Sequence, residues 1–216
     1  AVVGLDLKWV KDASGETYYL LNILDLATAF NVSCVVANKR PSTIAEAFKQ
    51  NWMSWAMTPE KVVADKGTEY FTDFQAMLSD LGIAYRLVPV ESPWQHGMVE
   101  RHGQVLAEII QAIATEKLVR GMQQMRDVAL HTCMAKNRRP GRTGYSPRTL
   151  VFGVDERLVA SGLNHYLEQP DDASIAAAGT NPDFKKSMEL RKAAMMALVD
   201  MDHSDKWKDA IQFPSR

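Results

Sequence analysis

The sequence has two cysteines among its 216 residues, and it contains no Cys-x-x-Cys or His-x-x-x-His pair. Two thiols cannot build a disulfide framework, and a structural zinc site needs several Cys or His ligands at close spacing. We therefore expect Cys34 and Cys133 to be buried thiols and the protein to be intracellular.

A long apolar run and a strong net charge are also missing. No stretch of about 18 or more apolar residues is present, so the sequence does not predict a membrane span. The formal net charge of −1 gives no overall indication of nucleic-acid binding. The segment 136–148 nevertheless carries five basic residues and no acid. Such a segment can bind phosphate on an otherwise neutral chain, and a solvated loop is the alternative interpretation.

The composition is that of a globular protein, with 46% hydrophobic and 24% charged residues. The length suits one domain with an extension. We predict a catalytic core over 1–155 and a linker with a helical extension over 156–216. Within the extension, 168–183 has the composition of a linker, and 184–199 is an amphipathic helix with Phe184, Met188, Met195 and Leu198 on one side.

Alternating and β-branched segments predict strands, and apolar residues at helical spacing predict helices. A loop that contains proline and glycine is expected between the fifth strand and the long helix that begins near residue 98. We expect Ser42 or Thr43 to cap the first helix. Three meandering strands followed by alternating helices and strands indicate an α/β fold with a mixed five-stranded sheet flanked by helices. The predicted strands are 2–10, 17–25, 30–36, 61–65 and 83–88, and the predicted helices begin near 42, 72, 98, 121 and 147.

Three acidic residues lie at positions where a carboxylate is unusual or suggests a function. Asp6 lies within an apolar strand, where an unpaired charge is costly. Asp65 ends the fourth strand, and Glu100 lies in the first turn of the long helix predicted from 98. Strand ends and a helix start can converge at one edge of a mixed sheet, and converging carboxylates repel one another unless cations neutralise them.

Carboxylate oxygens select hard ions, Mg²⁺ before Mn²⁺. Two such ions about 3.5–4 Å apart can hold the attacking and the leaving oxygen of a phosphoryl displacement. The pattern therefore favours a site with two Mg²⁺ (or Mn²⁺) ions held by Asp6, Asp65 and Glu100, although a chain with 26 acidic residues would contain some such trio by chance.

The residues around these acids resemble a known family. The stretch 65–70 has an Asp-x-Gly-x-Glu-Tyr turn, 81–83 is Leu-Gly-Ile, and 92–100 follows Ser-Pro-x-x-x-Gly-x-x-Glu. Upstream GLDLKWV (4–10) and LDLATAFNVSCVV (24–36) and downstream NRRPGRTGYSPRTLVFG (137–153) match in the same order. Over about 2–153 the chain resembles the integrase catalytic core of retroviruses and long-terminal-repeat retrotransposons.

That resemblance implies a ribonuclease-H-like fold and catalytic, metal-binding roles for Asp6, Asp65 and Glu100. It implies a polynucleotidyl transferase that trims the 3′ ends of element DNA and joins them to target DNA. It further implies DNA as partner, a homo-oligomer, and action in the nucleus.

The match departs from the family pattern in spacing and at several residues. Between Asp65 and Glu100 there are 34 residues, one fewer than retroviral members usually have. Lys66 stands where Asn is usual, and His96 stands where Asn or Gln is common. Helix positions Gln104 and Ala107 also lack the lysines that retroviral relatives often carry, which predicts a weaker DNA grip from this helix.

Several residues are candidates for DNA contacts, each with an alternative. Lys66 can pair with phosphate or with Glu69, and Trp94 can stack on a base or pack inside. Gln95 and His96 lie beside Glu100 and are otherwise ordinary loop residues. The basic segment adds candidates for salt-dependent phosphate contacts, which are Lys136, Arg138, Arg139 and Arg142.

Two other functions are also compatible with the sequence. A related transposase or nuclease of the same fold would cut DNA with water without joining ends. A host-captured element would bind DNA without catalysis, although the presence of all three acids argues against a decayed site.

Overall fold

The computed structural model describes residues 1–65, 67–87, 93–141, 144–153 and 182–212. All five predicted strands are confirmed to within about two residues at each end. The strands are β1 (Val2–Lys11), β2 (Thr17–Asp25), β3 (Asn31–Val36), β4 (Lys61–Ala64) and β5 (Ala84–Leu87). The helices are α1 (Pro41–Phe48), the π-helical η1 (Lys49–Met53), α2 (Ser54–Ala56), the 3₁₀ turn η2 (Thr68–Tyr70), α3 (Asp73–Asp80), α4 (Pro93–Glu116), α5 (Gly121–Arg138), α6 (Pro147–Phe152) and α9 (Pro182–Gln212).

The strands form one mixed sheet in the order β3-β2-β1-β4-β5. Strands β1, β2 and β3 form an antiparallel meander, whereas β4 and β5 run parallel to β1. This is the predicted fold class, a five-stranded mixed sheet with helices on both faces.

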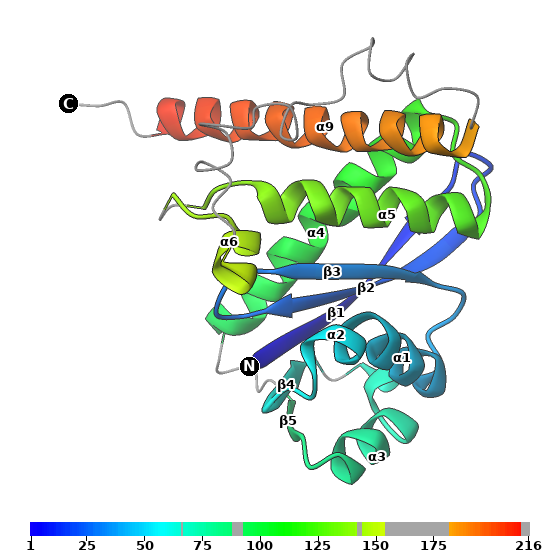
Figure 1. The fold of residues 1–216 in the computed structure, drawn as a ribbon, viewed down its shortest axis with the longest axis vertical. Helices are drawn as coiled ribbons and strands as arrows, with labels where there is room; N and C mark the ends of the chain where they lie inside the picture. Colours follow the sequence, from blue (N-terminus) through cyan, green and yellow to red (C-terminus); the bar gives the residue numbers. More distant parts are fainter. Residues whose placement is uncertain (66, 88–92, 142–143, 154–181, 213–216) are drawn as a thin grey trace.

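Helices cover the two faces of the sheet unequally (Figure 1). Helices α1 and α3 pack on one face, and α4, α5 and α9 build up two layers on the other. The alternation of β1 fits this arrangement, because Val3 and Leu5 belong to the core under α1 while Val10 belongs to the core under α4. Every second residue of a strand faces the same side, so Asp6 and Lys8 lie on the α4 face.

The C-terminal helix α9 joins the core under α4 and α5. Its buried residues Leu190, Ala193, Ala194 and Leu198 pack with those of α5. Ser187 Oγ also lies 2.9 Å from His131 Nε2 of α5. The helical extension is therefore packed against the core; residues 154–181, where the linker was predicted, are outside the described residues.

Helix α5 also covers the outer edge of β3. Asn137 Nδ2 donates to the Asn31 carbonyl (2.7 Å), and Asn31 N–H donates back to Asn137 Oδ1 (2.9 Å). Arg126 Nε donates to the carbonyl of Val35 at 3.3 Å. An unpaired strand edge is a template for unwanted pairing, and these side chains occupy it.

Two predicted helix starts are wrong. Helix α1 begins at Pro41 with Arg40 as its N-cap, not at Ser42 or Thr43. Proline suits the first helical turn because its fixed φ is already helical and its missing N–H is not needed there. For the same reason α4 begins at Pro93 rather than near 98, which places Glu100 in the second turn of the helix.

Several turn and cap residues take the roles that their side chains favour. Gly82 has a left-handed φ of +66° directly after α3, and Ser146 Oγ accepts the Thr149 N–H at the start of α6. Asp25 accepts the Thr28 hydroxyl, as expected of a turn residue. Both cysteines are free thiols; Cys133 is buried as predicted, whereas Cys34 is only partly buried, and burial raises its pKa to about 12. Among the helices that the structure describes, none combines the length and apolar character needed to cross a membrane.

Candidate active site

Asp6 lies in the middle of β1, and its side chain is nearly inaccessible, with 6% of the residue exposed. Its Oδ2 lies 3.3 Å from Lys8 Nζ, close enough for an ion pair, yet no described group makes a well-aligned hydrogen bond to that oxygen. Burial raises the pKa of Asp6; Lys8 opposes this shift, and the negative charges of Asp65 and Glu100 add to it. Asp6 is therefore a buried carboxylate with incompletely satisfied charge.

Asp65 follows the last residue of β4, next to β1 in the sheet. The parallel register pairs Val3 with Val62 and Gly4 with Val63, and its continuation brings Asp65 level with Asp6. Neighbouring strands are about 4.8 Å apart, so the two carboxylates start from adjacent positions. Asp65 Oδ1 accepts the Gly67 N–H at 2.9 Å, which orients the side chain within its turn.

Two carboxylates lie close to the Cα of Gly67. A Cβ at this position would stand 2.9 Å from Asp65 Oδ1 and 2.6 Å from Glu69 Oε1. The two acids therefore face the same small volume above the turn. A side chain at position 67 would force one or both of these carboxylates to shift.

Glu100 comes from α4, which lies unusually close to the sheet. A Cβ on Gly4 of β1 would stand 2.2 Å from Val99 Cγ2, and a Cβ on Gly103 would stand 2.4 Å from Asp6 Oδ2. One glycine on the strand and one on the helix thus permit the contact between β1 and α4. Glu100 itself is exposed, so its carboxylate is accessible from solvent.

The three acids are close enough to influence one another electrostatically, but their side chains do not form a metal-ligand cluster. Asp65 and Glu100 both act electrostatically on Asp6. Within the described residues, however, no group of three or more His, Cys, Asp or Glu side chains is gathered tightly enough to hold a metal ion. The donor set still fits a hard divalent cation, because it consists of carboxylates and includes the incompletely satisfied Asp6 Oδ2.

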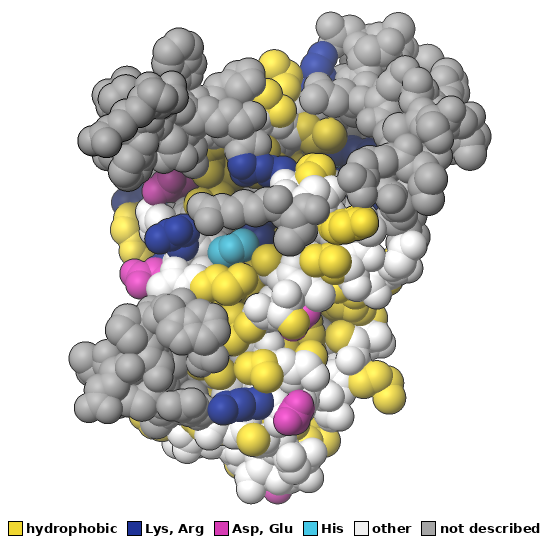
Figure 2. Space-filling view, turned by 90° about the vertical axis from the view of Figure 1, so that its left-hand side faces the viewer, with side chains coloured by type: hydrophobic (Ala, Val, Ile, Leu, Met, Phe, Trp, Pro, Cys, Tyr) yellow, Lys and Arg dark blue, Asp and Glu magenta, His cyan; other side chains and the backbone are white. Residues whose placement is uncertain are grey.

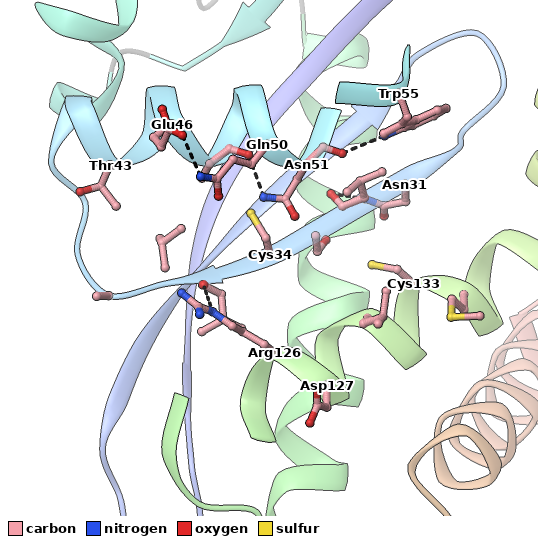
Figure 3. A pocket seen from close by; sticks show the side chains of 18 of the residues that line it. Asn31, Cys34, Thr43, Glu46, Gln50, Asn51, Trp55, Arg126, Asp127 and Cys133 are labelled. Atoms are coloured by element: carbon pink, nitrogen blue, oxygen red, sulfur yellow. Dashed lines mark hydrogen bonds between the residues drawn. The ribbon is translucent and has the colours of Figure 1, made fainter. Parts of the chain in front are cut away.

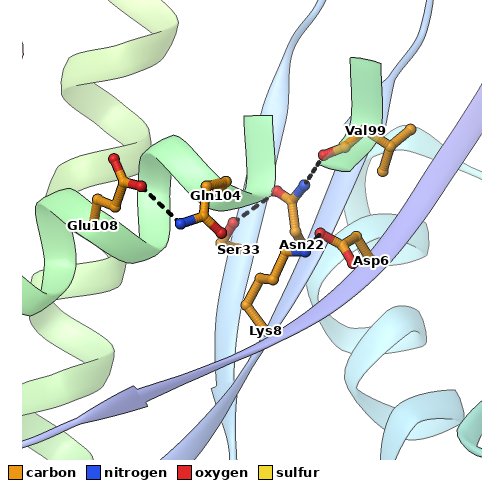
Figure 4. Close-up of polar contacts among 7 residues, drawn as sticks. All are labelled: Asp6, Lys8, Asn22, Ser33, Val99, Gln104 and Glu108. Atoms are coloured by element: carbon orange, nitrogen blue, oxygen red, sulfur yellow. Dashed lines mark hydrogen bonds and ion pairs between the residues drawn. The ribbon is translucent and has the colours of Figure 1, made fainter. Parts of the chain in front are cut away.

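Close to Asp6 lies a buried polar row that the sequence analysis missed. Asn22 of β2 is fully buried, and its Nδ2 donates to the Val99 carbonyl of α4 at 3.3 Å (Figure 4). Its Oδ1 accepts from Ser33 Oγ at 3.1 Å and from Asn31 Nδ2. The available indication was a single Asn in the apolar strand segment TYYLLNILD.

Tyr70 is a second buried polar group near the acids. It is fully buried, and no described group accepts from its hydroxyl. Burial raises its pKa well above the usual range, and the charges of Asp65, Asp6 and Glu69 add to the effect. Tyr70 therefore stays neutral beside the carboxylates and contributes no negative charge to them.

The residues predicted to contact DNA differ in where the structure places them. Lys136 is buried in α5 with 9% of the residue exposed, and burial lowers its pKa to about 8. Its expected place on a solvent-exposed basic segment is wrong, because the packing of α5 on the sheet turns it inward. Arg138 is partly exposed, and Arg139 is exposed, in or just after the last turn of α5. Lys66 and Arg142 lie outside the described residues, as do the side chains of Trp94, Gln95 and His96.

A cavity of about 1000 Å³ lies away from the acids, at the outer edge of β3 (Figure 3). Helices α1 and η1 form one wall and α5 forms the other; Gln50 and Asn51 come from the first wall and Arg126 from the second. None of the three acids lines this cavity.

The surface near α6 exposes aromatic and aliphatic side chains. Trp55, Phe30 and Phe152 pack against one another with ring centroids 5.4–5.8 Å apart, and Phe152 is 54% exposed. Seen from the side on which α6 lies, hydrophobic side chains spread over the middle of the molecule (Figure 2).

The protein is similar to known proteins in its three-dimensional structure. No protein-family model matches the sequence, and no curated protein matches it. The HTLV-2 integrase catalytic core domain, solved with magnesium, matches with a TM-score of 0.55 at 16% identity, over 68% of this chain and 92% of that one. The BIV integrase catalytic core domain matches with a TM-score of 0.56 at 15% identity, over 70% and 93%.

A chain of the simian T-cell lymphotropic virus intasome, solved with PP2A regulatory subunit B56 gamma, matches with a TM-score of 0.60 at 16% identity. The match covers 69% of this chain and 53% of that chain, so this protein spans about half of it. These likenesses define the fold: the chain has the ribonuclease-H-like fold of retroviral integrase catalytic cores.

Proposed function

We propose that this chain is the catalytic core of a retroelement integrase, which processes DNA 3′ ends and joins them to target DNA with Mg²⁺ or Mn²⁺. The observation that carries the proposal is the electrostatic influence of Asp65 and Glu100 on the buried Asp6, in a fold like that of integrase cores. Asp65 is level with Asp6 in the sheet, and the charges of both Asp65 and Glu100 act on Asp6.

The chain's own residues would hold and orient the reacting groups. Asp6, Asp65 and Glu100 would be the ligands, and the Gly67 N–H, which donates to Asp65 Oδ1, would hold that carboxylate in its orientation within the turn. The Lys8 ammonium, 3.3 Å from Asp6 Oδ2, would compete with a divalent cation for that oxygen. When bound, the divalent ions supply an activated water or 3′-hydroxyl and neutralise the leaving oxygen.

The remaining parts of the proposal follow from the likeness to integrase cores. The HTLV-2 core was solved in trimeric and dimeric forms, and the simian virus match comes from an intasome. We extend this to DNA as the partner, a homo-oligomer as the active form, and the nucleus as the place of action. Arg138 and Arg139 are the described basic candidates for phosphate contacts.

A strand-transfer assay tests this function. A labelled DNA duplex with recessed 3′ ends and a supercoiled plasmid would be incubated with the protein and Mn²⁺, with Asp65→Asn as control. Joined products that require Asp65 support an integrase. Cutting without joining would instead identify a nuclease of the same fold, and DNA binding without either reaction would identify a binding module.

A further inference from the structure

Three polar side chains lie side by side across the antiparallel half of the sheet. The register pairs Asp6 with Asn22, and Asn22 with Ser33. Directly paired residues point to the same face, here the one covered by α4. All three are buried, with 6%, 0% and 8% exposed. The row therefore begins at a proposed metal ligand and runs outward to β3.

The orientation of the Asn22 amide is determined by its partners. Its Oδ1 accepts from two donors on β3, Ser33 Oγ and Asn31 Nδ2. The NH₂ group must then face α4, where it donates to the Val99 carbonyl. A buried amide that faces two donors on one side and an acceptor on the other has one favourable orientation.

The carbonyl of Val99 belongs to the peptide bond that joins Val99 to Glu100 in α4. The same stretch of helix carries Gly103, and a Cβ there would lie 3.2 Å from Asn22 Nδ2 and 2.4 Å from Asp6 Oδ2. Asn22 and Asp6 thus face one point on the helix from neighbouring strands. A shift of α4 along or around its axis would break the bond to Val99 and move Glu100 with it.

We propose that Asn22 is a positioning residue that fixes the Glu100-bearing turn of α4 over Asp6. This inference rests on the proposed metal-dependent function and adds a residue to it. Asn22 contacts no reacting group; it acts through the Val99 carbonyl. Metal binding depends on the separation of the ligands. If α4 were free to shift, the distance between Glu100 and Asp6 would vary and the site would bind the ions less tightly.

Another buried amide in the same protein provides a matched control. Asn137 makes two hydrogen bonds to Asn31 at the edge of β3, so its loss should also destabilise the fold. It contacts neither Asp6 nor the α4 turn that carries Glu100. A merely structural role for Asn22 predicts that the two amides behave alike.

The test measures Mn²⁺ binding to the whole chain by isothermal titration calorimetry, with urea unfolding on the same samples. We expect Asn22→Leu to raise the Kd for Mn²⁺ about tenfold, the lower end for loss of an outer-shell partner of a metal ligand. Asn137→Leu should lower the unfolding midpoint and leave the Kd unchanged. Ser33→Ala, which leaves the Asn22 amide in place, should shift the Kd in the same direction by a smaller factor.

Two results would overturn the inference. One is an Asn22→Leu protein whose Kd equals that of wild type and of Asn137→Leu. The other, decisive if Asn22→Leu does not fold, is a folded Ser33→Ala protein with an unchanged Kd. Failure of the proposed function looks different, because the wild-type protein would then show no Mn²⁺ binding that Asp65→Asn removes.

Discussion

Asp6 and Asp12 are both buried, in the middle of β1 and directly after its end, yet their surroundings are opposite. Asp12 accepts hydrogen bonds from the N–H groups of Gly121, Ser14 and Glu16, and the Gly121 bond is the main reason that its pKa is lowered. The pKa of Asp6 is raised, mainly by burial. A carboxylate satisfied by backbone N–H groups stabilises the fold, whereas one surrounded by burial and other acids is suited to a cation.

Substituting each aspartate should separate the two roles most clearly in activity. Asp6→Asn should lower strand transfer about 100-fold or more, since ion-held charge stabilisation contributes several powers of ten to such reactions. Asp12→Asn should keep wild-type activity at temperatures where it remains folded. The assay is the labelled-duplex reaction with Mn²⁺. Equal losses in the two variants would remove the distinction between them.

Asp12→Asn should show its effect in stability instead. Because the folded-state pKa is lowered, the charged carboxylate stabilises the fold at neutral pH, and this contribution is lost as pH falls below the unfolded pKa of about 3.9. We expect the variant to melt several degrees lower at pH 7. Thermal denaturation followed by circular dichroism should show the gap narrowing only below about pH 4. A gap that widens in acid would contradict this explanation.

Asp6→Asn should have the reverse effect on stability. A folded-state pKa raised above the unfolded value means that the charged carboxylate costs stability at neutral pH, and the cost disappears as pH falls through the folded pKa. With EDTA present, the variant should melt a few degrees above wild type at pH 7 and lose this advantage in acid. Added Mn²⁺ should raise the wild-type midpoint and leave the variant unchanged. A variant less stable than wild type in EDTA would show that Asp6 is structural after all.

The smallest effect is expected at Lys8. Its ammonium lies 3.3 Å from Asp6 Oδ2 and competes with any cation for that oxygen. Lys8→Met should tighten Mn²⁺ binding about twofold to fivefold, which is the range for a partly exposed ion pair. Lys11→Met is the control, since Lys11 lies on the same strand over the Trp9 ring, 5.8 Å from its centroid. Weaker binding in Lys8→Met would mean that Lys8 holds the carboxylate in place for the ion.

The strands were predictable because apolar alternation is a local property. The strand order and the flanking motifs together allowed the prediction that Asp6 and Asp65 lie close to each other in the sheet. The start of α4 was not predictable in the same way, because Pro93 and Gly97 are typical of loops as well as of helix beginnings. Side-chain placement around Trp94 to His96 stays a prediction.

Long-range packing explains the remaining misses. The inward turn of Lys136 depends on how α5 docks on β3, which no local pattern encodes. The Asn22 bond to Val99 joins residues far apart in sequence, and a single Asn in an apolar strand does not indicate its partner. Hydrogen bonds of this kind become visible only when the sheet and the helix are placed together.

The central claim is that Asp6, Asp65 and Glu100 act together on one divalent site. Its most direct test is Mn²⁺ titration of the wild-type chain and of Asp6→Asn, Asp65→Asn and Glu100→Gln at pH 7, with Asp12→Asn as the buried control. We predict that each of the first three substitutions weakens Mn²⁺ binding about tenfold or more, because removal of a ligand costs at least as much as removal of its supporting partner. Asp12→Asn should bind like wild type. Unchanged Mn²⁺ affinity in Asp65→Asn or Glu100→Gln would contradict the shared site.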